Sequence, residues 1–169
     1  MCYLHFGFDS PVHLLTNLLF VYQNPHVQTA IPGRVSLSDV TFASNLQDEM
    51  SDVKTVLKAS LEEELCPENV SSCEALVPEV EETSSGGIGV LFKLVVDAPC
   101  ATSDCSYSNS AASDLHEQVS STLQQSVTNG SFLAAVQAKA NDASVNSFAN
   151  AGVQSGSLEG AIDVSPLIS

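Results

Sequence analysis

One segment, residues 88–97 with the sequence IGVLFKLVVD, limits the possible folds of this chain more than any other feature. Every second residue from Ile88 to Val96 is large and apolar, and this period of two is typical of a β-strand with one buried face. The turn residues Ser84 to Gly87 come directly before it, and glycine adopts positive φ in such a turn without steric cost. We therefore predict a hairpin whose second strand lies in the middle of a sheet.

A long amphipathic helix is predicted between Ser44 and Pro67. Ser44 followed by Gln47 is a capping-box pattern, and Pro67 is a stop signal. Apolar residues recur three and four positions apart between them, so they form one stripe over about six turns. The residues of this stripe are Leu46, Met50, Val53, Leu57, Leu61 and Leu65.

Extended segments flank this helix at residues 34–42 and 74–83. Pro78 lies in the second segment and cannot donate a ladder hydrogen bond. We therefore expect the second segment to be an edge strand or a broken strand.

The second half of the chain predicts a helix around residues 115–127, which ends at Asn129-Gly130. Ser131 can cap a further short helix, and a last extended segment begins near Phe148. The resulting order is β-α-β-β-α-β. This order predicts an α+β, ferredoxin-like fold, in which a four-stranded antiparallel sheet carries two long helices on one face and a short extra helix.

Residues 1–33 are predicted to be poorly ordered or loosely attached, and residues 34–169 to form a single domain. An apolar stretch, Val12 to Tyr22, is too short to span a bilayer, which needs about 20 apolar residues, so we expect no membrane insertion. No Lys or Arg precedes Arg34, so the stretch lacks the basic region of a signal peptide. We weigh a poor signal, a packing helix and a wrongly assigned start of a longer gene, and favour the last.

Four of the five cysteines form two short-range pairs and are our disulfide candidates. Cys66 and Cys73 enclose the segment PENVSS, and Cys100 and Cys105 enclose ATSD. Four cysteines allow three connectivities, which the sequence does not distinguish. We favour disulfides over free buried thiols and over zinc, because neither spacing is the CxxC knuckle of a zinc site.

Asn69 and Asn129 each begin an Asn-X-Ser triplet, which makes both residues candidate N-glycosylation sites. Chance is the alternative, because such triplets arise often in a chain rich in Ser and Asn. Together with the cysteine pairs, the triplets favour a secreted or cell-surface glycoprotein.

The formal net charge of -15 argues against nucleic acid or an anionic membrane surface as a partner, because both need clustered positive charge. The acidic residues form two clusters, which we interpret as a solvated face, since no EF-hand pattern is present. Weak binding of divalent ions is the alternative. The clusters are Glu62, Glu63, Glu64 and Glu68, and Glu79, Glu81 and Glu82.

Enzyme motifs are largely missing. No GxGxxG, GxxxxGKS/T or GxSxG segment is present, so a phosphate-binding loop and a nucleophile elbow have no support. His116-Glu117 begins like the zinc motif HExxH, but Ser120 stands where the second His belongs. We therefore expect no enzymatic activity, no cofactor and no metal, and we interpret His116 as a solvated surface residue.

Three segments resemble the SEA domains of mucins and other cell-surface glycoproteins: VSLSDVTF (35–42), NLQDEMSDVKTVLKASLEEEL (45–65) and SSGGIGVLFKLVV (84–96). The resemblance covers residues 34 to about 165 and implies the same order of elements. In that family the hairpin often carries a Gly-Ser step, whose Ser hydroxyl drives self-cleavage of the backbone. Gly87 stands in place of that Ser here, so the resemblance implies an SEA-like module without self-cleavage.

Our leading hypothesis is a non-enzymatic extracellular or cell-surface module that acts as a spacer, an adhesion domain or a protein-interaction domain. One alternative is a cytosolic ferredoxin-like module whose edge strand, residues 74–83, binds a partner peptide. Another alternative is a hydrolase with an unrecognised Ser or carboxylate site. The sequence indicates neither the identity of a partner nor an oligomeric state.

Overall fold

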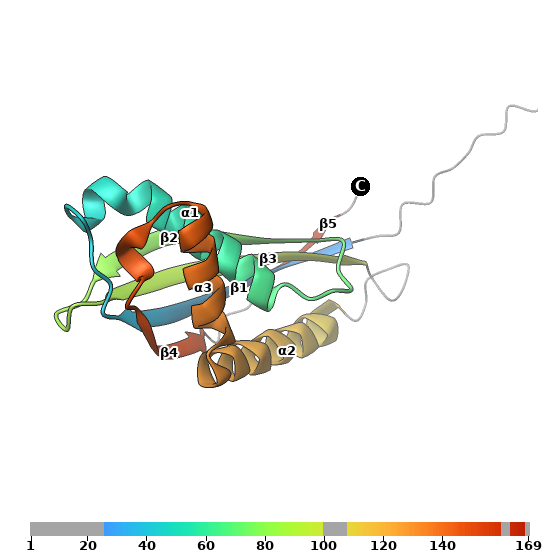
Figure 1. Cartoon of the computed structure of the whole chain (residues 1–169). Coiled ribbons are helices and arrows are strands. Elements are labelled where there is room, and N and C mark those ends of the chain that lie inside the picture. Colours follow the sequence, from blue (N-terminus) through green and yellow to red (C-terminus); the bar gives the residue numbers. More distant parts are fainter. Residues whose placement is uncertain (1–25, 100–107, 160–162, 168–169) are drawn as a thin grey trace, which may run out of the picture.

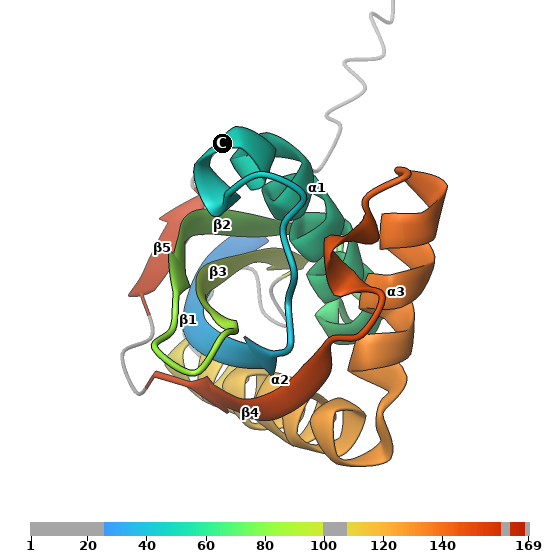
Figure 2. The ribbon, with the colours of Figure 1, turned by 60° about the vertical axis from the view of Figure 1, so that its left-hand side comes forward.

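The computed structural model describes residues 26–99, 108–159 and 163–167. It has an α+β fold in which three α-helices lie on one side of an antiparallel sheet (Figure 1, Figure 2). The strands are β1 (His26–Ser38), β2 (Ser72–Glu82), β3 (Ile88–Pro99), β4 (Gly152–Leu158) and β5 (Asp163–Leu167). The helices are α1 (Leu46–Leu65), α2 (Ser108–Asn129) and α3 (Ser131–Asp142), followed by a 3-10 turn, η1 (Asn146–Phe148).

The sheet has the strand order β2-β3-β1-β4, and β5 also pairs with β1. β1 pairs with β3 along almost its whole length, from His26 opposite Pro99 to Leu37 opposite Ile88. β5 pairs with the first residues of β1, and β4 pairs with its last residues. The four-stranded antiparallel sheet expected from the sequence is confirmed, and the last extended segment is divided into two strands.

The first strand begins earlier than predicted, at His26. The expected boundary is therefore wrong for residues 26–33, which form the first half of a central strand, while residues 1–25 lie outside the described residues. Alternate side chains are buried along the whole strand, but two of the buried positions are Thr29 and Gly33. Because neither residue is a large apolar one, the alternation that marks a strand is absent from the sequence here.

Pro32 also makes this strand difficult to predict from the sequence, since a proline argues against a central strand. Its carbonyl oxygen accepts a hydrogen bond from the backbone N–H of Glu159 at 2.9 Å. The nitrogen and oxygen of one strand residue point to the same side, so the missing N–H of Pro32 faces the gap between β4 and β5. At the other end, Asp39 has a positive φ of 54°, and the strand ends at Ser38 rather than at Phe42 as predicted.

The core lies between the sheet and the helices. The predicted apolar stripe of α1 is buried except for Met50, which is half-buried. The even-numbered side chains from Ile88 to Val96 are at most 2% exposed, which confirms residues 88–97 as a central strand. Phe132 of α3 and Phe148 of η1 are fully buried and complete this core.

β2 is confirmed as an edge strand, and its pairing with β3 shifts register around Pro78. Side chains of α1 cover part of this edge. Glu62 Oε1 accepts a hydrogen bond from the backbone N–H of Ala75 at 3.0 Å, and Lys54 Nζ donates to the carbonyl oxygen of Pro78 at 2.8 Å. A proline, a register shift and occupied backbone groups all protect an edge from pairing with another strand.

Candidate functional site

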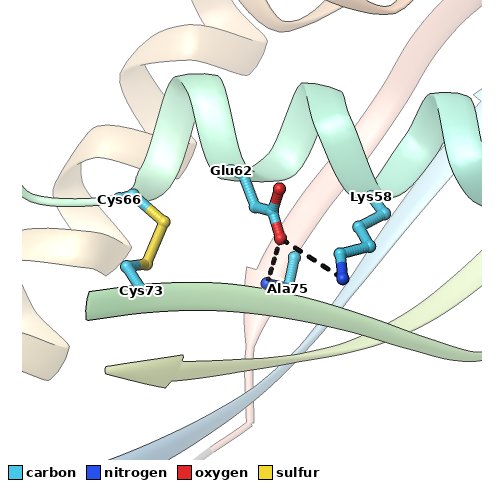
Figure 3. Close-up of a disulfide and its surroundings, with 5 residues drawn as sticks. All are labelled: Lys58, Glu62, Cys66, Cys73 and Ala75. Carbon is cyan, nitrogen blue, oxygen red and sulfur yellow. Dashed lines mark hydrogen bonds and ion pairs between the residues drawn. A yellow bond between two sulfur atoms is a disulfide. The ribbon is translucent and has the colours of Figure 1, made fainter. Parts of the chain in front are cut away.

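The segment from Cys66 to Cys73, here called the disulfide loop, connects the end of α1 with the start of β2. The Sγ atoms of its two ends are bonded, and their Cα atoms lie 5.7 Å apart (Figure 3). One of the two candidate cysteine pairs therefore has the geometry of a disulfide. Cys100 and Cys105, the other pair, lie outside the described residues.

Charged side chains extend the attachment of α1 to β2 over the two turns before the disulfide (Figure 3). Glu62 Oε1, which accepts from Ala75, lies 3.8 Å from Lys58 Nζ. The same ammonium group donates to Glu74 Oε1 at 2.6 Å, and this hydrogen bond raises the pKa of Lys58 above its ordinary value. The last turns of α1 are therefore held to β2 by a covalent bond and by a short chain of polar contacts.

The disulfide loop is also attached to the centre of the sheet. His26 Nδ1 of β1 lies 3.1 Å from Asp97 Oδ1 of β3 and 3.3 Å from Ser71 Oγ of the loop. In a catalytic triad the hydroxyl and the carboxylate contact different imidazole nitrogens, so that a proton can pass from one side to the other. Here both contact the same nitrogen, so the trio lacks the arrangement of a triad and holds the loop against the sheet. Sequence analysis missed these residues because His26 was placed in the N-terminal segment.

Both candidate glycosylation residues lie at the surface. Asn69 is exposed in the turn of the disulfide loop, and Asn129 is exposed as the last residue of α2. Asn129 Oδ1 accepts a hydrogen bond from the backbone N–H of Ser131 at 2.8 Å, and Ser131 Oγ donates to Glu64 Oε2 at 2.6 Å. The predicted cap at Ser131 is therefore wrong. Gly130, with φ 83°, is the N-cap residue of α3, and no side chain caps the start of this helix.

At the other end of α1, Glu49 joins three segments of the chain through contacts that we call the Glu49 latch. Glu49 Oε1 accepts hydrogen bonds from the backbone N–H groups of Ala43 and Ser44, at 2.6 and 3.3 Å. Glu49 Oε2 accepts a hydrogen bond from the hydroxyl of Ser147, which is buried. This last hydrogen bond is the main reason why the pKa of Glu49 is lowered. The latch lines an open groove of about 630 Å³.

The latch also changes how α1 begins. Asn45, not Ser44 as predicted, is the N-cap, and its Oδ1 accepts a hydrogen bond from the backbone N–H of Asp48 at 3.0 Å. Ser44 lies one residue too early, with its backbone N–H directed to Glu49. No short sequence motif signals the latch, because Ser147 is 98 residues away from Glu49.

The hairpin between β2 and β3 accepts no side chain at Gly87. A Cβ atom there would overlap the carbonyl oxygen of Leu37, which belongs to the backbone and cannot move aside cheaply. The turn is closed by a hydrogen bond from the Thr83 N–H to the Gly87 carbonyl at 2.8 Å, and by one from the Gly87 N–H to Thr83 Oγ1 at 3.1 Å. Glycine therefore occupies this position for a steric reason.

The two acidic clusters differ in their surroundings. In the first cluster, Glu63 Oε2 lies 2.6 Å from Lys139 Nζ, beside the contacts of Glu62 and Glu64 described above. The carboxylates of the second cluster, on β2, are exposed. The interpretation as a solvated face therefore needs correction for the first cluster, which connects α1 to β2 and α3.

His116 is half-buried on α2, with Nε2 3.4 Å from the carbonyl oxygen of Glu159. Within the described ranges, no three His, Cys, Asp or Glu side chains are grouped so that they could hold a metal ion. Among the helices of the same ranges, none combines the length and apolar character that crossing a membrane requires. No protein-family model, curated protein or solved structure matches this chain, so its function must be argued from its own contacts.

Proposed function

We propose that this chain is a non-enzymatic extracellular or cell-surface module with an SEA-like, ferredoxin-like fold, which acts as a spacer, an adhesion domain or a protein-interaction domain. The strand order β2-β3-β1-β4 supports the fold assignment. The crossover from β1 through α1 to β2 passes over β3, and the crossover from β3 through α2 to β4 passes over β1. Two such interleaved units make the split βαβ arrangement.

The observation that carries the proposal is the disulfide between Cys66 and Cys73. Disulfides persist in secreted and cell-surface proteins and are rare in the reducing cytosol. The same bond closes the loop that contains Asn69, a candidate glycosylation residue. Two features that are typical of one compartment therefore occur within a single loop.

Two further observations support a module that neither cleaves itself nor acts as a hydrolase. A Ser at position 87, the position of the Ser in self-cleaving SEA domains, would overlap the backbone at Leu37. Ser71 contacts His26 at the nitrogen that also faces Asp97, which leaves the hydroxyl without the base geometry of a nucleophile.

The experiment that tests the proposal measures where the protein is and whether Cys66 and Cys73 are oxidised. Thiols are alkylated at the moment when cells producing the full chain are lysed, and peptides are mapped by mass spectrometry before and after reduction. We expect both cysteines to be alkylated only after reduction, in protein from the medium or the cell surface. Alkylation of both without reduction, in protein confined to the cytosol, would contradict the proposal.

The peptide-binding alternative is favoured by one observation, the exposed edge of β2. Leu76 on this strand is 43% exposed, and a groove of about 370 Å³ runs between β2 and α1. An added strand would have to displace Lys54 from Pro78 and Glu62 from Ala75, which makes this candidate the weaker one. Binding of a peptide strand would perturb amide NMR signals from residues 74–83, whereas perturbation elsewhere would exclude this mode.

A further inference from the structure

We infer that folding closes the acceptor triplet that begins at Asn69, so that a glycan is added there before the Cys66–Cys73 disulfide forms or not at all. This inference rests on the proposed extracellular function, because glycans of this class are added along the secretory route. It concerns the order of two covalent events in one loop of eight residues.

The product of glycosylation fits the folded structure. Asn69 is exposed in its turn, between the exposed Glu68 and the half-buried Val70. A glycan on Asn69 Nδ2 would therefore extend from the surface without displacing the core. The folded structure therefore accommodates the glycosylated product, and what it limits is the transfer reaction.

The reaction needs more of the loop than the asparagine side chain. Asn69 Nδ2 loses a proton and forms a bond to C1 of an oligosaccharide, while the bond from C1 to a lipid-linked pyrophosphate breaks and the lipid pyrophosphate leaves. The transferase reads the Ser hydroxyl two residues further on as well as the amide. The backbone from Asn69 to Ser71 must therefore leave the protein surface and enter the active site of the enzyme.

Ser71 is exposed, but contacts with both central strands hold it against the sheet and must break before it can leave. Its hydroxyl is 3.3 Å from His26 Nδ1, and its backbone N–H donates to the Asp97 carbonyl oxygen at 2.8 Å. Val70, between the two triplet residues, packs against the hydrophobic core. The disulfide then joins the ends of the loop, seven residues apart in sequence, so the loop cannot straighten even when these contacts break.

The triplet at Asn129 provides a contrast within the same molecule. Its serine, Ser131, is also engaged in the fold, through the hydrogen bond to Glu64. No disulfide among the described residues encloses it, and it lies at the junction of two helices. Opening of the Asn129 triplet therefore depends on the fold alone, whereas opening of the Asn69 triplet depends on the fold and on the disulfide.

The experiment uses unglycosylated full-length chain, a purified oligosaccharyltransferase and an oligosaccharide on lipid pyrophosphate as donor. Mass spectrometry measures the occupancy of both asparagines in folded, oxidised protein and in reduced, unfolded protein. We expect occupancy at Asn69 to be at least about tenfold lower in the oxidised protein, because the reactive loop must open locally before transfer. Equal occupancy of Asn69 in the two forms would overturn the inference.

A variant separates the disulfide from the rest of the fold. In the C66S/C73S double variant, we expect occupancy to rise at Asn69 and to stay low at Asn129, which reports on global unfolding. His26→Ala, which keeps the disulfide, should raise occupancy at Asn69 less. A rise at both asparagines in the double variant would assign the closure to the fold as a whole and overturn the role of the disulfide.

The result is independent of where the cell places the protein. If the protein were found in the cytosol with free thiols, the proposed function would fail, yet the transfer reaction in vitro would still show whether folding closes the Asn69 triplet. Conversely, if the protein were secreted and Asn69 could still be fully glycosylated after the disulfide had formed, the proposed function would stand and this inference would be wrong.

Discussion

Helix α1 is fastened to the rest of the molecule at both ends, by different chemistry. At its C-terminal end, the bond between Cys66 and Cys73 joins it covalently to β2. At its N-terminal end, Glu49 accepts hydrogen bonds from the preceding loop and from Ser147. The two fastenings are about 25 Å apart along the helix, given the rise of about 1.5 Å per residue.

The attachment of this one helix therefore depends on two unrelated properties of its surroundings. The disulfide is sensitive to reductant and insensitive to protonation. The Glu49 latch is insensitive to reductant, and it weakens when the carboxylate takes up a proton. Between them, the helix is held by apolar burial, which depends on neither condition.

The largest expected effect comes from the middle of α1, where burial holds the helix between its two fastenings. Leu61 is fully buried, so Leu61→Ala should lower the free energy of unfolding by about 3 kcal/mol, through lost burial and the cavity that remains. Urea denaturation measures the change. The matched control is Leu76→Ala on β2, where the side chain is 43% exposed and the loss should be at most about 0.5 kcal/mol. Equal losses would show that α1 is not packed as described.

The covalent fastening should contribute the next largest effect. The double variant C66S/C73S should lose about 2 kcal/mol, because a short closed loop restricts the unfolded chain modestly. Reductant should destabilise the wild type and leave the stability of the double variant nearly unchanged, as measured by urea denaturation with and without reductant. If reductant destabilised the double variant by the same amount, the sensitivity to reductant would come from other cysteines.

Removal of one hydroxyl should weaken the Glu49 latch by a smaller amount. Ser147→Ala should cost about 1 kcal/mol, since a hydrogen bond to a carboxylate is lost and water can replace it in the open groove. The effect should be additive with that of C66S/C73S, because the two sites share no partner. Ser155→Ala, at an exposed position of β4, is the matched control and should change stability little. Strong non-additivity would mean that the two fastenings are coupled.

The smallest effect is a dependence on pH. The pKa of Glu49 is lowered by its hydrogen bond to Ser147, so its folded-state pKa lies below the unfolded-state value. The contribution of the latch is therefore present above the unfolded-state pKa and is lost as the pH falls through the folded-state pKa. Thermal unfolding between pH 6 and pH 3 should show a shallower decline in Glu49→Gln than in the wild type. Gln47→Ala, at an exposed and uncharged position on the same helix, is the control and should leave the slope of the wild type unchanged.

The two halves of the core differ in how far the sequence predicts them. Residues 88–97 and the stripe of α1 carry complete apolar periods, and both were predicted correctly. The first half of β1 was not, because Thr29 and Gly33 occupy buried positions and Pro32 lies in a central strand, opposite the gap between β4 and β5. Local sequence patterns therefore fail to predict a strand where the arrangement of the neighbouring strands, and not the strand's own sequence, allows a residue such as Pro32.

The candidate site divides in the same way. Cys66 and Cys73 were disulfide candidates from the sequence, but the sequence left three connectivities open, and the fold shows that these two are bonded to each other. The contacts of Ser71 with His26 and of Glu49 with Ser147 join residues 45 and 98 positions apart. Only the folded chain brings such residues together, so no spacing or motif in the sequence indicates them.

The pairing of β1 with β5 determines how the domain would respond to a pulling force. His26 at the start of β1 lies directly opposite Leu167 at the end of β5, so the described chain enters and leaves the domain at neighbouring points. The two strands are antiparallel, and tension applied to these residues would separate the ladder from its end, one hydrogen bond at a time. Under such tension the folded domain would add little length, and the ladder between β1 and β5 would open before the core of the domain.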